Sequence, residues 1–481
     1  MLKIFNTLTK TKEKFIPLEK GKVKIYVCGP TVYSEAHVGH ARTYLIFDVM
    51  IRFLEYLGYE VIYVRNITDV GHLREDVWED RIIIGAKREK VHPMELVDKY
   101  MIMFFEQMEK LGMRRPNIQP RASAHITEMW EMIKDLIEKG YAYVVKDGSV
   151  YFDVSKFEDY GKLSGIKKDE LVKHRIEPAP GKKNPADFAL WKACDETYPL
   201  RWKSPWGLGF PGWHIECSVM GLKYLGEQFD MHGGAKDLIF PHHENEIAQS
   251  EAYTGKKPFV RYWLHTGLVK IRGEKMSKSK GNIISLNEIL EKYDPEVLRI
   301  WIISNHYRSE IDFNEEALMN AKKILNKIYT TLELLEEISV QEKLEVEKLN
   351  KEEKKFYDKI LELKKDFINA MEDDFNTPLA LSKFLEISSI SNEFFSKNKN
   401  QKLANFAREV FIELGKIFGL FQELKKIPNI QEKLIEKILE FREKLRKEGK
   451  FELSDELRKS LGEVGLKIED TPRGPKWRIE A

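Results

Sequence analysis

The sequence has few cysteines and no long apolar run. Among 481 residues only Cys28, Cys194 and Cys217 carry thiols, an odd and small number that argues against a disulfide-stapled scaffold. No stretch approaches the ~20 consecutive apolar residues that a membrane span needs. Residues 1–20 alternate charged residues with isolated apolar ones, unlike a secretory or transit segment. We therefore expect a cytoplasmic protein with reduced thiols and no membrane partner.

Net charge is also nearly absent. The formal charge at neutral pH is +2, from 79 basic and 77 acidic residues. Binding to nucleic acid must therefore depend on local basic patches and not on a basic chain as a whole. The charged fraction of 32% is compatible with the ion-pair networks of heat-tolerant proteins. With 42% hydrophobic residues, the chain is long enough for about three to four units with cores of their own.

A strand, a loop, a helix and a second strand are predicted near the N-terminus. Residues 23–29 are rich in β-branched side chains and end in a Gly-Pro breaker. From about Ala41 apolar residues recur at i, i+4 and i+8 until Gly58, which predicts a helix with a glycine C-cap. Residues 60–67 follow as a second buried strand, which completes a β-loop-α-β unit.

The segment His37-Val38-Gly39-His40 falls where the first strand turns into the helix. We expect free backbone N–H groups and the positive end of the helix dipole there, a combination that favours phosphate. Gly39 would let a ligand approach the backbone closely. Taken alone, however, two histidines at a surface turn are common.

A cationic loop lies far downstream, where Lys275-Met276-Ser277-Lys278-Ser279 stands between Gly273 and Gly281. The charges of Lys275 and Lys278 suit the triphosphate as charge builds on it during reaction, and glycines at both ends would let the loop close. A solvated loop is the alternative for such a cluster.

Two cysteines, a histidine and a glutamate have the chemistry of a zinc site. Cys28 ends the first strand, Cys217 lies in a polar segment at 212–218, and His242 and Glu246 are spaced i, i+4 on one helical face. Two thiolates, an imidazole and a carboxylate would form a tetrahedral zinc site. Spacing alone leaves open that each cysteine is a buried core residue and that the His–Glu pair lies on a helix surface.

The two signature segments, HVGH at 37–40 and KMSKS at 275–279, resemble those of the class I aminoacyl-tRNA synthetases in this order around a doubly wound pattern. HVGH differs from the HIGH of that class by one aliphatic residue. Further segments resemble one family of the class, the cysteinyl-tRNA synthetases; they are CGPTVY (28–33), NITD (66–69), GWHIECS (212–218), FPHHENEIAQSE (240–251), EDDFNTPLAL (372–381) and DTPRGPKW (470–477). Residues 70–81 depart from the shorter acidic turn of many relatives, so the pocket outline there stays open.

The resemblance implies a cysteine–tRNA ligase that acts through cysteinyl-adenylate, with L-cysteine, ATP and tRNA(Cys) as substrates. It assigns one zinc ion per chain to the positions Cys28, Cys217, His242 and Glu246, and Mg²⁺ to ATP. A zinc ion would prefer the thiolate of cysteine to the hydroxyl of serine, a discrimination that shape alone, at ~1–3 kcal/mol, cannot supply. No editing domain is then needed.

The resemblance also assigns the remaining site residues. Catalytic roles fall to His37, His40, Lys275 and Lys278. The ATP contacts are expected at His37, Gly39, His40, Gly234, Asp237 and Lys278. The cysteine substrate is expected at Gly29, Thr31, Thr68, Trp213 and His232. Core packing is the alternative for Trp213.

The expected fold is α/β, with a Rossmann-like catalytic domain and a connective insertion, followed by a helical bundle and a small mixed α/β C-terminal domain. Beyond 320 the chain is rich in Lys, Glu, Leu and Ile, with helical periodicity; a coiled-coil rod is the alternative, although 376–378 and 415–419 interrupt any heptad. The expected parts are the first catalytic half 1–120, the insertion 121–207, the second half 208–260, the KMSKS and stem-contact region 261–318, the bundle 319–425 and the anticodon-binding domain 426–481.

The C-terminal end carries the expected anticodon reader, with Asp470, Arg473 and Trp477 as its contacts. Trp477 suits stacking on an unpaired base, although a hydrophobic anchor is the alternative. Two rival functions are a non-catalytic tRNA-binding paralogue and a ligase that passes activated cysteine to an amine on a small sugar. Intact HVGH and KMSKS segments disfavour the first, and the C-terminal module disfavours the second. We expect a monomer.

Overall fold

The computed structural model of the protein describes residues 1–71, 73–74, 79–166, 181–271, 273–275, 283–422, 430–463, 466–471 and 474–479. The chain divides into two compact units, Met1–Leu420 and Phe421–Ala481. Within the described ranges, no helix combines the length and the apolar character that crossing a bilayer requires.

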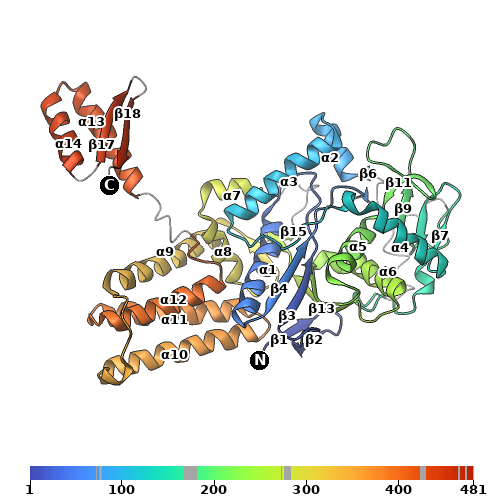
Figure 1. The fold of residues 1–481 in the computed structure, drawn as a ribbon, viewed down its shortest axis with the longest axis horizontal. Helices are drawn as coiled ribbons and strands as arrows, with labels where there is room; N and C mark the ends of the chain where they lie inside the picture. The colour runs from blue at the N-terminus through green and yellow to red at the C-terminus, as the bar shows by residue number, and fades with distance from the viewer. Residues whose placement is uncertain are drawn as a thin grey trace. The chain divides into compact units, whose positions relative to one another are not determined.

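A four-stranded parallel sheet forms the centre of the larger unit (Figure 1). Its strands, in spatial order, are β13 (Val260–Thr266), β12 (Phe229–Ala235), β3 (Lys22–Val27) and β4 (Glu60–Arg65). Such a sheet is covered by helices on both faces, which is why its strands are largely apolar. The carboxyl ends of all four strands meet at one edge, where the loops that follow them are brought together.

The helix α1 (Val38–Tyr56) connects β3 to β4 and confirms the predicted β-loop-α-β unit. It begins at Val38 and not at Ala41, because the His37 side chain caps the first turn and lets the helix start earlier. It ends before Gly58, whose φ of +88° makes glycine favourable there, as predicted. The helices α5 (Trp213–Leu225) and α6 (Glu244–Thr254) lie on the other side of the sheet (Figure 1).

A separate antiparallel sheet is inserted between the two halves of the parallel one. Its spatial order is β10 (Trp202–Ser204), β11 (Gly207–Pro211), β9 (Phe188–Ala193), β8 (Val150–Phe152) and β7 (Ala142–Val144). The helices of this stretch are α2 (Arg81–Glu89), α3 (Pro93–Lys110) and α4 (Ile126–Glu138), and two short strands, β5 (Leu73–Arg74) and β6 (Glu79–Asp80), pair before them. Two hairpin strands, β1 (Lys3–Asn6) and β2 (Thr11–Lys14), open the chain.

The segment after β13 forms a small three-stranded sheet and two helices. The strands, in spatial order, are β15 (Glu274–Lys275), β14 (Val269–Ile271) and β16 (Ile311–Phe313). The helices are α7 (Leu286–Lys292) and α8 (Pro295–Ile303), both begun by side-chain caps, Ser285 and Asp294.

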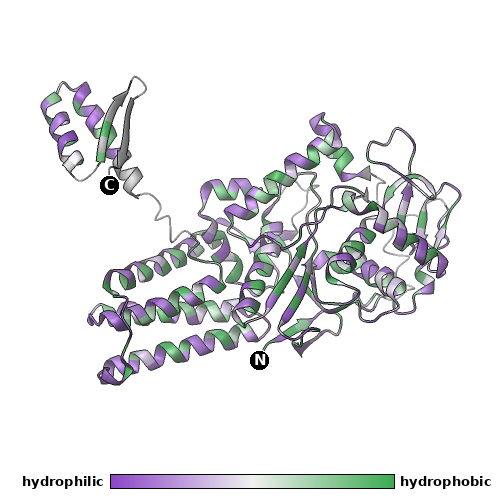
Figure 2. Ribbon diagram, viewed as in Figure 1, coloured by the Kyte–Doolittle hydropathy of each residue, from purple (hydrophilic) through white to green (hydrophobic). Residues whose placement is uncertain are grey.

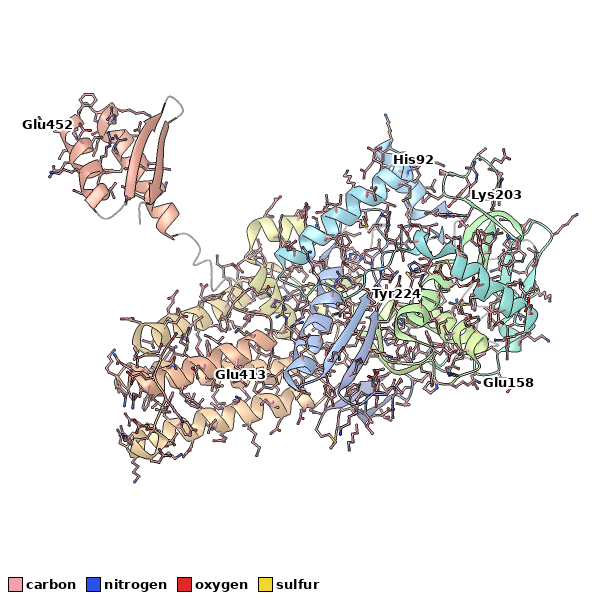
Figure 3. The ribbon with its side chains drawn as sticks, viewed as in Figure 1. His92, Glu158, Lys203, Tyr224, Glu413 and Glu452 are labelled. Atoms are coloured by element: carbon pink, nitrogen blue, oxygen red, sulfur yellow. The ribbon has the colours of Figure 1, made fainter. Side chains whose placement is uncertain are left out.

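Four amphipathic helices then pack against one another, which confirms the helical bundle. They are α9 (Glu315–Ile338), α10 (Lys351–Glu372), α11 (Thr377–Phe395) and α12 (Gln401–Ile417). Hydrophobic and hydrophilic segments alternate along each of them (Figure 2). The bundle meets α1, where the Tyr56 hydroxyl donates to Glu413 of α12 at 2.8 Å; Glu413 is labelled in Figure 3.

The second unit is small and contains two helices and a hairpin. These are α13 (Ile430–Lys447), α14 (Phe451–Glu463), β17 (Leu466–Thr471) and β18 (Gly474–Ile479). The two strands are antiparallel, with Ile468 opposite Trp477 and Asp470 opposite Pro475.

Candidate active site and metal centre

The carboxyl edge of the parallel sheet gathers the residues expected around the cysteine substrate. Thr31, in the loop after β3, forms a parallel bridge with Thr68, in the loop after β4. The Gly29 N–H donates to the Asn66 side chain at 2.7 Å, and the Asn66 amide donates to the Thr68 hydroxyl at 3.1 Å. A Cβ at Gly29 would overlap the Asn66 backbone, so only glycine permits this approach of the two loops. Gly29, Thr31 and Thr68 therefore share one site.

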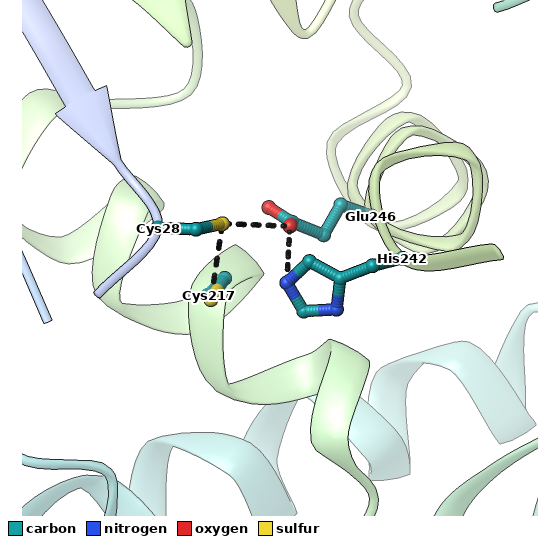
Figure 4. Close-up of side chains that lie close together, drawn as sticks. All are labelled: Cys28, Cys217, His242 and Glu246. Atoms are coloured by element: carbon teal, nitrogen blue, oxygen red, sulfur yellow. Dashed lines mark hydrogen bonds and ion pairs between the residues drawn. The ribbon is translucent and has the colours of Figure 1, made fainter. Parts of the chain in front are cut away.

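The four residues expected to bind zinc also converge at this edge (Figure 4). Cys28 directly follows β3, Cys217 lies in α5, His242 lies in the irregular turn before α6, and Glu246 lies in α6. All four side chains are buried, and their candidate ligand atoms lie within 4.8 Å of one another. Packing thus joins residues that are far apart along the chain.

The distances within this cluster suit a small ion. The two thiols of Cys28 and Cys217 are 3.9 Å apart, and Cys28 lies 3.7 Å from Oε1 of Glu246. His242 Nε2 lies 2.9 Å from the same oxygen. Two sulfurs, one imidazole nitrogen and one carboxylate oxygen form a donor set that zinc prefers.

The charges of the cluster fit a bound cation. Burial by itself would raise the pKa of Glu246, but the nearby His232 and His242 lower it to about 2. Burial also opposes ionisation of Cys217, yet the hydrogen bond from Cys28 and the charge of His242 lower its pKa to about 6. Burial and the neighbouring Cys217 raise the pKa of Cys28 well above its usual range. Holding both thiols as thiolates therefore requires a positive ion between them.

Two further histidines face the same cluster. His232 Nε2 lies 2.9 Å from Oε2 of Glu246, and His243 Nε2 lies 3.3 Å from the Cys28 thiol. With Cys28 and Glu246 they form a second possible donor set. His232, which we expect in the cysteine pocket, lies beside the four candidate metal ligands. Sequence reasoning missed His243, although the doubled histidine at 242–243 was a visible signal.

A second layer of side chains holds the candidate ligands in place. His214 Nδ1 lies 3.0 Å from His242 Nδ1, and the Trp213 ring stacks on His242 with ring centres 4.1 Å apart. Such partners fix the orientation of a ligating imidazole. Trp213, an expected contact of the cysteine substrate, thus lies against His242, and His214 was missed because nothing in its spacing marks it.

His243 is oriented by a second chain of partners that the sequence did not reveal. Its Nδ1 lies 2.8 Å from Nε2 of His265 in β13, and Nδ1 of His265 lies 2.8 Å from the Thr7 hydroxyl. Burial lowers the pKa of His265 to about 3, so this ring is neutral.

The turn at 37–40 differs from the prediction of free backbone N–H groups. His37 Nδ1 accepts from the Gly39 N–H at 3.2 Å, and His40 Nδ1 accepts from the His37 N–H at 3.2 Å. The two imidazoles therefore form a capping box and occupy the donors themselves. Because both Nδ1 atoms accept, the proton of each neutral ring resides on Nε2, which is then the N–H donor of the ring.

The chain after the KMSKS segment returns to this turn. The Val38 N–H donates to Ile284 at 3.3 Å, and His37 pairs with Ser285 in an isolated bridge. Lys275 ends β15, opposite Lys270, whereas Lys278 lies outside the described residues. The backbone thus places the downstream end of this segment beside the histidine turn.

Arg42 of α1 joins the histidine turn to the sheet that carries Lys275. Its buried guanidinium donates to the carbonyls of Leu268 at 2.8 Å, Tyr307 at 3.3 Å and Ser309. Leu268 directly precedes β14. A buried arginine with three carbonyl partners fixes the position of one segment relative to the other.

The other expected contacts lie as follows. Gly234 is buried at the end of β12, where a Cβ would come within 3.1 Å of the His243 ring. Asp237 is exposed in the short turn after that strand. In the smaller unit, Asp470 lies in β17 and Trp477 in β18, whereas Arg473 is outside the described residues.

Comparison with known families gives two matches within the chain. Residues 14–323 match the tRNA synthetases class I (C) catalytic domain, and residues 366–422 match the DALR domain. The chain is 48% identical over 483 residues to the cysteine–tRNA ligase of Thermococcus onnurineus, with 99% of each chain covered. It is 46% identical to that of Carboxydothermus hydrogenoformans, with 99% of this chain and 100% of the relative covered.

Solved structures share the fold at low sequence identity. Methionyl-tRNA synthetase of Mycobacterium tuberculosis, in complex with methionyl-adenylate, has a TM-score of 0.59 and 15% identity, with 82% of this chain and 90% of that chain covered. Arginyl-tRNA synthetase of Thermus thermophilus has a TM-score of 0.54 and 12% identity, with 86% and 84% covered. These likenesses confirm the α/β fold class.

Proposed function

The chain belongs to the cysteine–tRNA ligase family, and from this membership we propose that it joins L-cysteine to the 3′ end of tRNA(Cys) in two steps. The cysteine carboxylate first attacks the α-phosphate of ATP, which releases pyrophosphate and leaves cysteinyl-adenylate. A hydroxyl of the terminal adenosine then attacks the mixed anhydride, and AMP leaves. The observation that carries this proposal is the convergence of two thiols, an imidazole and a carboxylate at the sheet edge that also bears the histidine turn.

We propose that Cys28, Cys217, His242 and Glu246 hold one zinc ion per chain. When bound, zinc supplies a soft Lewis acid that favours the substrate thiolate over a serine hydroxyl. Trp213 supports the site by stacking on His242. A metal ion is needed for this selection because shape alone distinguishes near-isosteric side chains by only ~1–3 kcal/mol.

The residues around the metal cluster would receive the remainder of cysteine. We assign this role to Gly29, Thr31, Thr68 and His232, of which Gly29 and Thr68 are already linked through Asn66. A pocket built on these short loops holds the cysteine carboxylate in one orientation, and orientation of the reacting groups supplies a large part of such a rate enhancement.

The first step needs stabilisation of charge on the phosphates. We propose that His37 and His40 donate from Nε2 to phosphate oxygens, and that Lys275 and Lys278 stabilise the departing pyrophosphate, with Mg²⁺ accompanying ATP. Gly39, Gly234 and Asp237 are the further proposed ATP contacts. Arg42 supports this assignment, since it ties α1 to the segment that leads into β14.

We propose that the parts of the chain divide the work as the sequence suggests. Residues 1–120 and 208–260 form the activating domain, 121–207 the insertion, and 261–318 the region that carries the lysine loop and meets the acceptor stem. Residues 319–425 form the bundle. Residues 426–481 read the anticodon, with Asp470, Arg473 and Trp477 as contacts. The match to full-length cysteine–tRNA ligases, which includes this last part, supports the assignment.

The proposal is tested by two measurements on the purified protein. Zinc content is determined by elemental analysis, and ATP–pyrophosphate exchange is followed with cysteine and, separately, with serine. We expect about one zinc per chain and exchange with cysteine alone. Exchange with serine at a comparable rate, or protein that carries no zinc, would contradict the proposed basis of selection.

A further inference from the structure

One buried carboxylate at the site has no assigned role. Glu216 lies in the first turn of α5 and is fully buried. Neither of its carboxylate oxygens has a hydrogen-bond partner among the described residues. Leaving a buried carboxylate without a partner is costly, so such a group calls for a specific explanation.

Glu216 shares a helical face with two residues of the proposed site. Trp213, Glu216 and Cys217 are spaced i, i+3 and i+4 in α5, which puts them on one side of the helix. Opposite them lies the loop after β4, where a Cβ on Gly71 would come within 2.9 Å of Oε1 of Glu216. Thr68, an expected contact of the cysteine substrate, lies close enough to act on the same carboxylate.

The surroundings of Glu216 are negative. Burial, together with the charges of Cys217, Asp69 and Asp80, raises the pKa of the Glu216 carboxyl well above its usual range, and Thr68 offsets only part of this rise. Both aspartates have partners of their own: Asp69 accepts from Arg121 and from the Ser123 N–H, each at 2.8 Å. Asp80 accepts from the Tyr198 hydroxyl at 2.8 Å. Glu216 is therefore the group left to receive a positively charged ligand.

We propose that Glu216 receives the α-ammonium group of the substrate cysteine. In cysteine the sulfur and the ammonium nitrogen are separated by three bonds, so the ammonium must lie next to the residues that take the sulfur. Glu216 adjoins Cys217 in the sequence and lies beside Thr68, which satisfies this condition. The ammonium would provide the missing partner and would orient the carboxylate of cysteine toward ATP.

This assignment rests on the proposed function and gives the site a second criterion of selection. The metal cluster recognises the thiol, whereas Glu216 recognises that the thiol belongs to an α-amino acid. Small thiols that lack an amine, which would otherwise compete for the metal cluster, are then bound weakly.

The test compares L-cysteine with 3-mercaptopropionate, which has the thiol and the carboxylate but no amine. Binding of each to the full-length zinc-loaded protein is measured by calorimetry in the absence of ATP. We expect Glu216→Gln to weaken cysteine binding by about ten- to a hundredfold, the loss of a hydrogen bond to a charged group, and to leave 3-mercaptopropionate unchanged. Glu251→Gln is the matched control, because Glu251 is also buried but pairs with Lys162.

Thermal melting separates a binding role from a structural one. Because burial and the negative neighbours raise the pKa of Glu216 well above its usual range, exchanging its carboxyl for an amide is expected not to lower the melting temperature of the ligand-free protein, and zinc content should stay the same. A lower melting temperature, together with equally weakened binding of both ligands, would show that Glu216 has a structural role and would overturn the proposal. Should Glu216→Gln fail to fold, Glu216→Asp, which keeps the charge but shortens its reach, is expected to weaken cysteine alone.

Two other results would also overturn the inference. Unchanged cysteine binding with an increased Mg²⁺ requirement for exchange would assign the carboxylate to a divalent cation. Wild-type protein that binds both thiols equally would remove the ammonium site but leave thiol selection intact, whereas wild-type protein that binds neither would contradict the proposed function as well.

Discussion

The helical bundle and the carboxyl edge of the parallel sheet are both buried, but their interiors differ in composition. The bundle buries apolar side chains and stacked rings, such as Phe384 on Phe411 at 4.3 Å and Phe356 on Phe394 at 4.2 Å. Within the four bundle helices the fully buried polar side chains are hydroxyls, such as Thr331 and Ser388, which hydrogen-bond each other at 2.6 Å. Buried apolar side chains and paired hydroxyls of this kind favour stability.

The sheet edge buries ionisable groups that an interior ordinarily excludes. They include Glu216, His232, His242, His243, Glu244, Glu246 and His265, together with two cysteines. Placing these groups out of water costs stability, and the cost is reduced only where a partner is present. The comparison teaches that the interior of the bundle contributes stability, whereas the sheet edge gives up stability to keep ionisable groups out of water and in fixed positions.

The largest expected effect is the loss of a metal ligand. Cys217→Ser should reduce zinc content well below one per chain and slow cysteine-dependent exchange by at least about a hundredfold, since even loss of a supporting partner of a ligand costs up to about that much. Elemental analysis and pyrophosphate exchange measure the two effects. Cys194→Ser is the control, because Cys194 is partly exposed and lies outside the cluster. Full zinc in Cys217→Ser would refute the assignment.

Truncation of a buried side chain in the bundle should lower stability without affecting the recognition of cysteine. Phe384→Ala removes a fully buried ring and should lower the free energy of unfolding by about 3–5 kcal/mol while the KM for cysteine stays unchanged. Urea unfolding and steady-state kinetics measure this. Leu379→Ala on the same helix is the control, since Leu379 is 47% exposed and its loss should stay within about 0.5 kcal/mol. If Phe384→Ala instead changed the KM for cysteine and left the free energy of unfolding unchanged, the bundle would not differ from the sheet edge in the way proposed.

A buried ion pair lies where α1 and α8 meet the end of α12. Arg299 of α8 donates to Asp48 of α1 at 2.7 Å and to the carbonyl of Phe418, at the end of α12, at 3.0 Å. Burial would raise the pKa of Asp48, but the charges of Arg299 and Arg52 outweigh it and lower that pKa. Asp48→Asn should therefore cost about 3–5 kcal/mol at neutral pH, because it leaves a buried guanidinium without its counter-charge.

The same pair predicts a pH dependence of stability. A lowered pKa in the folded state means that the unfolded chain takes up the proton first, so the pair stabilises fully above the usual carboxyl pKa of about 4 and loses this contribution as the pH falls through the folded-state value. The difference in unfolding free energy between wild type and Asp48→Asn should shrink on acidification below about pH 4. A difference independent of pH would show that Asp48 does not act through its charge.

The smallest expected effect lies outside both regions. If the unit at 421–481 reads the anticodon, Trp477→Ala should raise the KM for tRNA several-fold, a loss on the scale of about 1 kcal/mol or more for one stacked base. ATP–pyrophosphate exchange should be unchanged, because activation of cysteine does not involve this unit. An unaltered KM for tRNA would leave Trp477 as a hydrophobic anchor.

Much of the fold was predictable because its signals are local. The strand that ends before Gly29, the helix that ends before Gly58 and the amphipathic helices after 320 follow from propensity and periodicity within each segment. The four candidate zinc ligands were predictable only from resemblance to a known family. Spacing alone could not unite Cys28 with Cys217, because no local pattern records which strand and helix will pack together.

The sequence by itself determined the elements, their order and the chemical types available for catalysis, because these depend on neighbouring residues. Only the tertiary structure decided that His37 and His40 cap their own helix, that His243 faces Cys28, and that Glu216 remains without a partner. These outcomes depend on distances between elements and on the loss of water around them. The distances and the exclusion of water are established only when the sheet packs against its helices. Neither can be read from the linear order of residues.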